Sequence, residues 1–186
     1  MTRATPKTDI VAMRREARKH IEEGAVTADY SANREEVLKQ LNEALSTELV
    51  CVLRYRRHYF MARGIHSRGV AEEFLAHSNE ELGHADRLAA RIVQLGGEPD
   101  FDPAQLTGRS HAEYVAAESL SEMIKEDLIA ERIAIHSYRD MIQYIGTADP
   151  TTSDLLKSIL AVEEEHADEL ADLLVDLPAH HTTAKG

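Results

Sequence analysis

The sequence predicts an all-α protein, an antiparallel four-helix bundle with one long connection between its second and third helices. Apolar residues recur at alternating steps of three and four along four long segments, the spacing of amphipathic helices. Helix caps, glycines and prolines separate these segments. The chain has 186 residues, of which 43% are hydrophobic, and it contains no tryptophan and only five prolines. This composition is typical of one soluble helical domain with a sizeable core.

Signals that start and stop helices locate the four segments. We expect long helices at residues 33–62, 68–95, 110–145 and 149–177. Asn33 with Glu36 and Ser110 with Glu113 have the spacing of capping boxes, and Asp149 precedes a proline at the first helical position. Glycines follow the first three segments and a proline follows the fourth, so each helix has a defined end.

The lengths of the connections predict the topology. Short turns join the first helix to the second and the third to the fourth, so each pair should form an antiparallel hairpin. The turn-rich stretch GGEPDFDPAQLTGR, residues 96–109, is long enough to cross the bundle between the hairpins. We therefore divide the chain into an N-terminal extension, 1–32, with a short helix at 9–23, a bundle, 33–177, and a tail, 178–186.

Charge is distributed unevenly along the chain. The net charge is -12, yet residues 1–20 carry six Lys or Arg against two acidic residues. The acidic remainder should attract cations and disfavour nucleic acid. The basic arm is either an exposed helix face, the simpler interpretation, or a contact for DNA. The single cysteine, Cys51, favours a reducing compartment, the cytoplasm, and neither a signal sequence nor a membrane span is evident.

An acidic residue interrupts the apolar stripe near the middle of each expected helix. These residues are Glu48, Glu81, Glu131 and Glu163. His84 and His166 follow two of them by three residues, on the same helix face. Four buried carboxylates without compensation would be very costly. Two divalent cations would balance their charge, with the two histidines as neutral ligands.

An internal repeat supports this interpretation. The motif ExxHADxL occurs at 81–88 and 163–170, and LxxE occurs at 45–48 and 128–131, so each hairpin would contribute matching groups. The alternative is an acidic bundle whose Glu and His side chains face solvent or pair with arginines. One ExxH motif alone favours that alternative, whereas the six residues together favour a site for two metals. Carboxylates with a few imidazoles suit iron or manganese.

The chain resembles the bacterioferritins, which belong to the ferritin-like di-iron carboxylate proteins. Four stretches carry the resemblance across residues 33–177: LNEALSTELVCVLRYRRHYFMARG, HSNEELGHADRLAARIVQLGG, EDLIAERIAIHSYRDMIQYIG and ILAVEEEHADEL. The resemblance implies that Glu48 and Glu131 are terminal ligands, that Glu81 and Glu163 bridge two irons, and that His84 and His166 bind one iron each. Tyr55 matches a tyrosine that the family keeps beside its first-helix ligand, with a redox or a packing role.

The implied activity is that of a ferroxidase. It would oxidise Fe(II) with O2 or hydrogen peroxide at two irons within one subunit, with manganese as the alternative metal. Iron storage, detoxification and protection from oxidative stress would follow in a homo-oligomer of 12 or 24 subunits. The alternatives are a non-storing di-iron or di-manganese peroxidase or catalase, and a DNA-protecting Dps-like mini-ferritin that uses the basic arm.

Departures from the family pattern qualify the resemblance. Leu82 occupies the position of the methionine that binds haem in bacterioferritins, which argues against haem. The longer N-terminal region and the short segment after His166 weaken the case for a cage of 24 and make a smaller, Dps-like dodecamer an alternative. His77, one turn before Glu81, either guides iron or packs, and we favour packing. Glu80 and Glu164 flank the expected ligands and should be solvated or line an inner surface.

Overall fold

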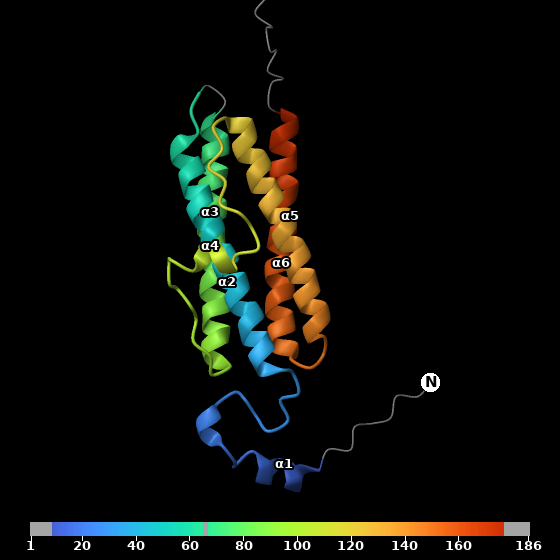
Figure 1. Ribbon diagram of the computed structural model, residues 1–186. Coiled ribbons are helices and arrows are strands. Elements are labelled where there is room, and N and C mark those ends of the chain that lie inside the picture. The colour runs from blue at the N-terminus through green and yellow to red at the C-terminus, as the bar shows by residue number, and fades with distance from the viewer. Residues whose placement is uncertain (1–8, 65–66, 177–186) are drawn as a thin grey trace, which may run out of the picture.

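The computed structural model describes residues 9–64 and 67–176, and four long helices lie side by side in it (Figure 1). They are α2 (Arg34–Met61), α3 (Ser67–Gln94), α5 (Leu120–Ile145) and α6 (Pro150–Asp176). Helix α2 packs along α3 and α5 packs along α6, while contacts of α2 with α5 and of α3 with α6 join the two hairpins. No strand occurs within the described ranges. The expected fold class is confirmed.

The starts of α2 and α6 follow the sequence signals. The Asn33 side chain accepts a hydrogen bond from the backbone N–H of Glu36 at 3.3 Å. At α6, the Asp149 carboxylate accepts one from the N–H of Thr152 at 2.9 Å. The Asp149 carboxylate also forms a salt bridge with Arg91 of α3 at 2.9 Å. This salt bridge links the N-terminal cap of α6 to the last turns of α3. Each cap satisfies a backbone donor that the helix itself leaves unpaired.

The expected start of the third long helix near Ser110 is wrong. Helix α5 begins at Leu120, and Ser119 forms the capping box with Glu122. Both serines precede a glutamate by three residues, so the local pattern does not distinguish them. Tertiary contacts determine where α5 begins, because side chains of α2 bind the backbone of the segment between the two serines. Arg54 donates to the carbonyl of Glu113 at 2.9 Å, and Thr47 accepts from the N–H of His111 at 3.0 Å.

The crossover therefore runs along α2 in an extended path instead of extending α5. It contains one short helix, α4 (Leu106–Arg109), which lies beside the middle of α2 (Figure 1). The Arg54 guanidinium also binds Asp127 of α5 at 2.7 Å, and His58 lies 2.8 Å from the same carboxylate. These buried groups fix α2, the crossover and α5 relative to one another.

The N-terminal extension contains the expected short helix. Helix α1 (Ile10–Glu16) is followed by a turn of 3-10 helix, η1 (Ile21–Glu23), and neither contains a buried residue. Both lie beyond the end of the bundle (Figure 1). The expected tail at 178–186 and the first residues of the basic arm lie outside the described residues. None of the helices that the structure describes combines the length and apolar character needed to cross a membrane.

Two apolar clusters fill the bundle, one toward each end. One contains Leu41, Leu45, Leu88, Ile92 and Leu156, among others. The other contains Phe74, Met123, Ile124 and Leu170 with their neighbours. Each buried aliphatic side chain contributes roughly 1.5–3 kcal/mol to folding. The layer between the clusters is polar, and it holds the residues that interrupt the four stripes.

Candidate metal centre

Six ionisable side chains converge in this polar layer. Helix α2 contributes Glu48, α3 contributes Glu81 and His84, α5 contributes Glu131, and α6 contributes Glu163 and His166. None of the six residues is more than 4% exposed. The solvent-facing alternative therefore does not describe these side chains. The helices place them together because each occupies a core-facing position near the middle of its stripe.

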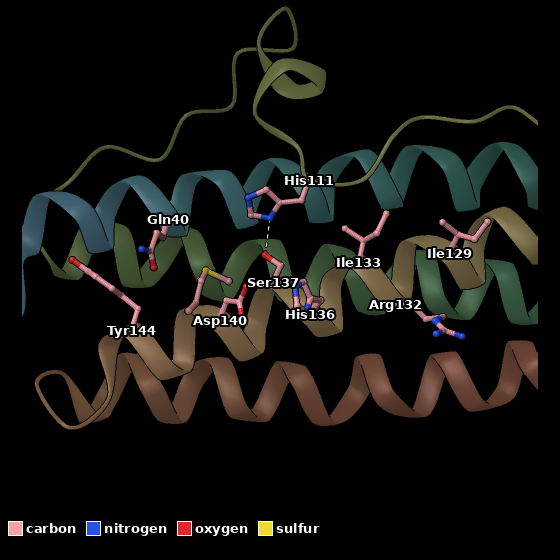
Figure 2. Close-up of a pocket in the computed structure, with 10 residues that line it drawn as sticks. Gln40, His111, Ile129, Arg132, Ile133, His136, Ser137, Asp140 and Tyr144 are labelled. Carbon is pink, nitrogen blue, oxygen red and sulfur yellow. Dashed lines mark hydrogen bonds and ion pairs between the residues drawn. The ribbon is translucent and has the colours of Figure 1, made fainter.

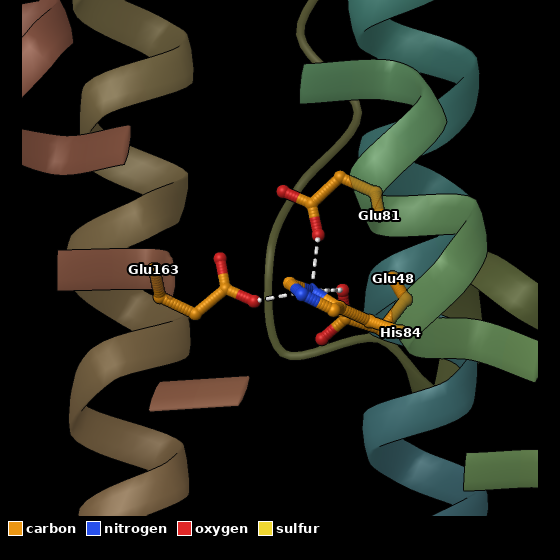
Figure 3. A group of neighbouring side chains, drawn as sticks. All are labelled: Glu48, Glu81, His84 and Glu163. Carbon is orange, nitrogen blue, oxygen red and sulfur yellow. Dashed lines mark hydrogen bonds and ion pairs between the residues drawn. The ribbon is translucent and has the colours of Figure 1, made fainter. Parts of the chain in front are cut away.

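The six residues form two groups that overlap. In each group, one ligand atom from every member lies within 4.8 Å of the others. The first contains Glu48, Glu81, His84 and Glu163 (Figure 3). The second contains Glu81, Glu131, Glu163 and His166. Glu81 and Glu163 belong to both groups, while each histidine belongs to one. This arrangement has the form of two adjacent cation sites joined by two shared carboxylates.

Both histidines direct Nδ1 toward the centre of the layer. His84 Nδ1 lies 2.9 Å from Glu163, 3.3 Å from Glu81 and 3.5 Å from Glu48. His166 Nδ1 lies 3.5 Å from Glu81, 3.8 Å from Glu163 and 3.9 Å from Glu131. At the other side of the His166 ring, Nε2 lies 2.6 Å from the Glu80 carboxylate. In the neutral ring that a metal ligand requires, Nε2 therefore donates its hydrogen to Glu80, and Nδ1 presents a lone pair.

Several buried atoms of this layer have no hydrogen-bond partner among the described residues. They are Glu81 Oε1, Glu131 Oε2, Glu163 Oε2 and His166 Nδ1, and Glu163 Oε1 has only its ion-pair contact with His84 Nδ1 at 2.9 Å. In their metal-binding forms, ionised carboxylate and neutral imidazole, all are electron-pair donors, and all belong to the overlapping groups. Buried polar atoms are usually satisfied, because leaving one unpaired costs about 1–3 kcal/mol. Cations would satisfy all of them together, so the residues fit a dimetal centre.

Two tyrosines connect the hairpins through this layer. Tyr55 of α2 donates a hydrogen bond to Glu131 of α5, and Tyr138 of α5 donates one to Glu48 of α2. Each tyrosine lies seven residues after the glutamate of its own helix and binds the glutamate of the other. Sequence analysis selected only Tyr55. The equal spacing from Glu131 to Tyr138 was the signal that could have identified its partner.

Comparison with known proteins assigns the family. A family model for the ferritin-like domain matches residues 38–179. The chain belongs to the ferritin family. Bacterioferritin of Rhodobacter capsulatus is 30% identical over 138 residues, which cover 72% of this chain and 80% of that protein. The DNA protection during starvation protein of Pyrococcus furiosus is 29% identical over 150 residues, or 79% of this chain and 81% of that protein.

A solved structure agrees with these relatives. It is that of a dodecameric thioferritin, the bacterioferritin-related protein from Bacteroides fragilis. That chain is 32% identical, and the match has a TM-score of 0.76 and covers 78% of this chain and 88% of the other. The fold and the four-helix arrangement of the present chain are therefore those of the ferritin family, and its buried clusters are consistent with a di-iron site.

The carboxyl groups of this ferritin-like protein differ in acidity. Burial, and then the charge of Glu81, raises the pKa of Glu48 and Glu163 well above the ordinary value. The same two causes raise the pKa of Glu131 to about 7. For Glu81, burial acts against ionisation, but hydrogen bonds with Glu48 and the two histidines outweigh it and lower the pKa. Glu81 thus has the lowest pKa of the four carboxyl groups in the layer.

The two histidines show the opposite tendency. Burial lowers their pKa, but hydrogen bonds and charge interactions with the carboxylates outweigh burial. The pKa rises to about 10 for His84 and to about 9 for His166. Protons thus compensate the carboxylates when no cation is bound, and a bound cation would displace them.

Four residues near the dimetal layer were considered in the sequence analysis, and one of them, Glu80, differs from its expected role. Glu80 is not only a solvated acid, because it accepts a hydrogen bond from His166. His77 is buried, and its ring stacks on that of His166 at a centroid distance of 4.0 Å. Leu82, at the position that argues against haem, is 42% exposed on α3. Burial raises the pKa of the Cys51 thiol well above its usual value, so this cysteine should be unreactive.

A separate surface cleft lies along α5 (Figure 2). It has a volume of about 690 Å³, and isoleucines and Tyr144 supply much of its lining. Its polar groups include His111, whose Nδ1 lies 2.6 Å from the Ser137 hydroxyl. None of the six residues of the dimetal layer lines this cleft. The cleft is therefore distinct from the candidate metal centre.

Proposed function

We propose that this protein is a ferroxidase that oxidises Fe(II) at a dimetal site within a single chain, using O2 or hydrogen peroxide. The observation that carries the proposal is the pair of buried Glu/His groups that share Glu81 and Glu163. A pair of neighbouring metal sites suits a two-electron oxidant, since each iron supplies one electron. Iron fits a donor set of four carboxylates and two imidazoles, and manganese is the alternative.

Each ligand has a proposed role. Glu81 and Glu163, which belong to both groups, would be shared by the two irons. Glu48 and Glu131 would each hold one iron, and His84 and His166 would each complete one site through Nδ1. Four negative charges then balance the four positive charges of two Fe(II) ions. The same unpartnered oxygen and nitrogen atoms that are costly without a cation become ligand atoms.

The electrons and protons of the proposed reaction balance with Fe(II), the oxidant and protons from solution. Two Fe(II) ions lose one electron each, and hydrogen peroxide takes up these two electrons and two protons to give two water molecules. With O2 as the oxidant, the same two electrons and two protons give hydrogen peroxide. Fe(III) is the product in both cases, and the iron is the substrate as well as the redox centre.

The protein's own residues prepare the site for this chemistry. The apolar clusters on either side limit access of water, which strengthens charge interactions inside the layer. Tyr55 and Tyr138 hold the two terminal carboxylates through hydrogen bonds. Glu80 keeps His166 in the tautomer that presents Nδ1. We assign Tyr55 a positioning role, and electron donation by its phenol is the alternative, which the variant Tyr55→Phe distinguishes.

The direct test is anaerobic loading of Fe(II) followed by addition of O2 or hydrogen peroxide. We expect ferric absorbance to appear faster than in protein-free buffer, with two irons oxidised per added peroxide. The double variant Glu81→Gln/Glu163→Gln should oxidise iron at the protein-free rate, because it lacks both shared carboxylates. Circular dichroism verifies that this variant is folded. A folded wild-type protein that gives no acceleration would overturn the ferroxidase proposal.

Storage of the ferric product in a homo-oligomeric shell is the proposed biological role. The related thioferritin from Bacteroides fragilis is a dodecamer, and its chain resembles this one over most of its length, which supports 12 subunits over 24. Light scattering gives the mass, and iron analysis after loading gives the iron content. A dodecamer that retains far more than two irons per chain supports storage. A dimer that turns over peroxide without retaining iron supports the non-storing enzyme instead.

DNA protection is a second candidate, because a relative from Pyrococcus furiosus has that name. Arg14 and Arg15 in α1 are exposed, and α1 contains no buried residue. The acidic bundle makes this arm the proposed DNA contact. A gel-shift assay of the full chain and of a chain without residues 1–24 tests it. Undiminished binding by the shortened chain excludes the arm as the DNA contact, and absence of binding by the full chain excludes the DNA-protecting function.

We propose the cytoplasm as the compartment of the protein, because its single cysteine, Cys51, is free.

A further inference from the structure

A groove between α3 and α6 leads from the protein surface toward the dimetal layer. It has a volume of about 380 Å³. Its lining includes four exposed carboxylates, of Glu73, Glu80, Glu165 and Glu169, and three buried histidines, His77, His84 and His166. Two of those histidines belong to the dimetal layer. His77 does not belong to either overlapping group, and its position in the groove needs a separate explanation.

Both ring nitrogens of His77 face an oxygen atom, so the tautomer of the ring decides which nitrogen presents a lone pair. Tyr55 has a single hydroxyl hydrogen, which it donates to Glu131. In the tautomer with its hydrogen on Nδ1, His77 donates to the Tyr55 oxygen, which lies 3.3 Å from Nδ1. In the neutral ring, Nε2 then has no hydrogen and presents a lone pair.

That lone pair faces a carboxylate instead of a donor. His77 Nε2 lies 2.8 Å from Glu169 Oε2. Two electron-pair donors at this distance repel each other unless a positive charge accompanies them. The Glu73 carboxylate, one turn before His77 on α3, adds further negative charge at the same place, and one ligand atom from each of the three residues lies within 4.8 Å of the others. Two carboxylates and a lone-pair nitrogen form a donor set for a divalent cation.

We propose that Glu73, His77 and Glu169 form a third metal site, for one Fe(II) or a similar divalent cation, at the outer mouth of this groove. His77 supplies a nitrogen from a buried ring whose Nδ1–H is fixed by Tyr55. The carboxylates of Glu73 and Glu169 supply oxygens from the solvent side, and water completes the coordination. The site differs from the dimetal layer in being open and in having one histidine with only two carboxylates.

The position of this site indicates its use. The His77 ring stacks on His166, a proposed iron ligand, at 4.0 Å between centroids and 18° between planes. A cation held by His77 therefore lies one histidine away from the dimetal layer, on the approach from solvent. The site would concentrate Fe(II) at the entrance before it moves inward. This use rests on the proposed ferroxidase function, whereas the binding of a cation does not.

The test of binding uses Zn²⁺ in the absence of any oxidant. We compare the wild-type chain, the variant Glu73→Gln/Glu169→Gln, and the matched control Glu72→Gln/Asp168→Asn. The control removes two exposed carboxylates adjacent in sequence to the tested pair, neither of which lines the groove. All substituted residues are exposed, so each variant should fold, and circular dichroism checks this. Equilibrium dialysis then measures bound zinc.

The expected result is that the tested variant binds about one zinc per chain fewer than the wild type, while the control binds as much as the wild type. A difference is measured because the ligands of the dimetal layer are present in all three chains and would also take up zinc. Crystals soaked in Zn²⁺ should also show an anomalous peak between Glu73, His77 and Glu169. Equal zinc binding by the tested variant and the wild type would overturn the proposal, leaving a hydrogen bond from His77 Nε2–H to Glu169 as the explanation.

The role in iron entry has a separate readout. At low Fe(II) concentration, the tested variant should oxidise iron at least about tenfold more slowly than the control, and high Fe(II) should restore its rate, because local concentration of substrate no longer matters. Equal rates at low Fe(II) would overturn the entry role. If no chain oxidises iron, the ferroxidase proposal fails, while the zinc difference still decides whether the third site exists.

Discussion

The hydroxyl of Tyr55 on α2 donates a hydrogen bond to the carboxylate of Glu131 on α5. Tyr138 on α5 forms the reciprocal bond with Glu48 on α2. Each hairpin therefore positions a carboxylate of the other, and the dimetal layer is complete only when both hairpins are packed. Burial and the neighbouring carboxylates raise the pKa of both phenols well above the ordinary value, so both remain protonated donors.

The reciprocal bonds predict the behaviour of two matched variants. Tyr55→Phe and Tyr138→Phe each remove one hydrogen bond to a terminal carboxylate, so each should lower the free energy of unfolding by about 1–2 kcal/mol. Both should slow iron oxidation by a similar factor, since the two bonds are equivalent. Thermal unfolding and stopped-flow oxidation measure these effects. If Tyr55→Phe alone abolishes oxidation, the Tyr55 phenol takes part in electron transfer and the positioning role is insufficient.

The acidity of Glu131 predicts how the metal-free protein responds to pH. Its pKa is raised to about 7, mainly by burial, so the folded protein favours the protonated form. The stabilisation from this group is fully present below the unfolded value of 4.5 and is lost as the pH rises through 7. Glu131→Gln cannot ionise and keeps an oxygen for the Tyr55 bond. We expect this variant to be more stable than the wild type at pH 8, by on the order of 2–3 kcal/mol.

Thermal unfolding in the presence of a chelator measures this difference at pH 5 and at pH 8. The stability gain of Glu131→Gln should be much smaller at pH 5, where Glu131 is already largely protonated. Glu72→Gln is the control, because Glu72 is exposed and lies outside the layer. A gain that is the same at both pH values would contradict the raised pKa of Glu131.

The four-helix bundle and the convergence of the six polar residues could be predicted from the sequence, because both follow from the regular spacing of core-facing positions along a helix. A core-facing position every three or four residues is determined by helix geometry, and it persists whatever the local contacts are. The start of the third long helix depends on tertiary contacts instead. Ser110 and Ser119 have the same capping pattern, and only the contacts of Arg54 and Thr47 with the crossover show which serine caps α5.

The contacts of residues around the dimetal layer were harder to predict from the sequence, because they too depend on how the helices pack against one another. Glu80 lies next to Glu81, one position off the core-facing stripe, which usually indicates a solvated side chain. Its bond to His166 depends on how closely α3 approaches α6. Tyr138 could have been found, because its spacing from Glu131 repeats that of Tyr55 from Glu48. The contact of each tyrosine with the opposite hairpin could not have been.

Metal binding should release protons. With raised pKa values of about 10 and about 9, His84 and His166 are protonated near pH 7.5 in the metal-free protein, but a histidine ligand must be neutral. We therefore expect release of about two protons per chain from the histidines, with further protons from the carboxyls, and an affinity that increases with pH. Calorimetry of Mn²⁺ binding in buffers of different ionisation enthalpy counts the protons. A binding enthalpy that is independent of the buffer would contradict the prediction.

Glu80 predicts a difference between the two metal positions. It accepts a hydrogen bond from His166 Nε2, whereas Val162 occupies the matching position before Glu163 and offers His84 no such partner. Glu80→Ala should therefore weaken one of the two metal positions by about 10- to 100-fold and leave the other unchanged, because His166 loses the bond that fixes its tautomer. Glu80→Gln retains an acceptor and should restore part of the affinity.

Glu164→Ala is the matched control, because Glu164 flanks Glu163 but pairs with the exposed Arg139. Stepwise Mn²⁺ titration measures both affinities, and an equal loss in Glu80→Ala and Glu164→Ala would assign the effect to surface charge instead of to the orientation of His166.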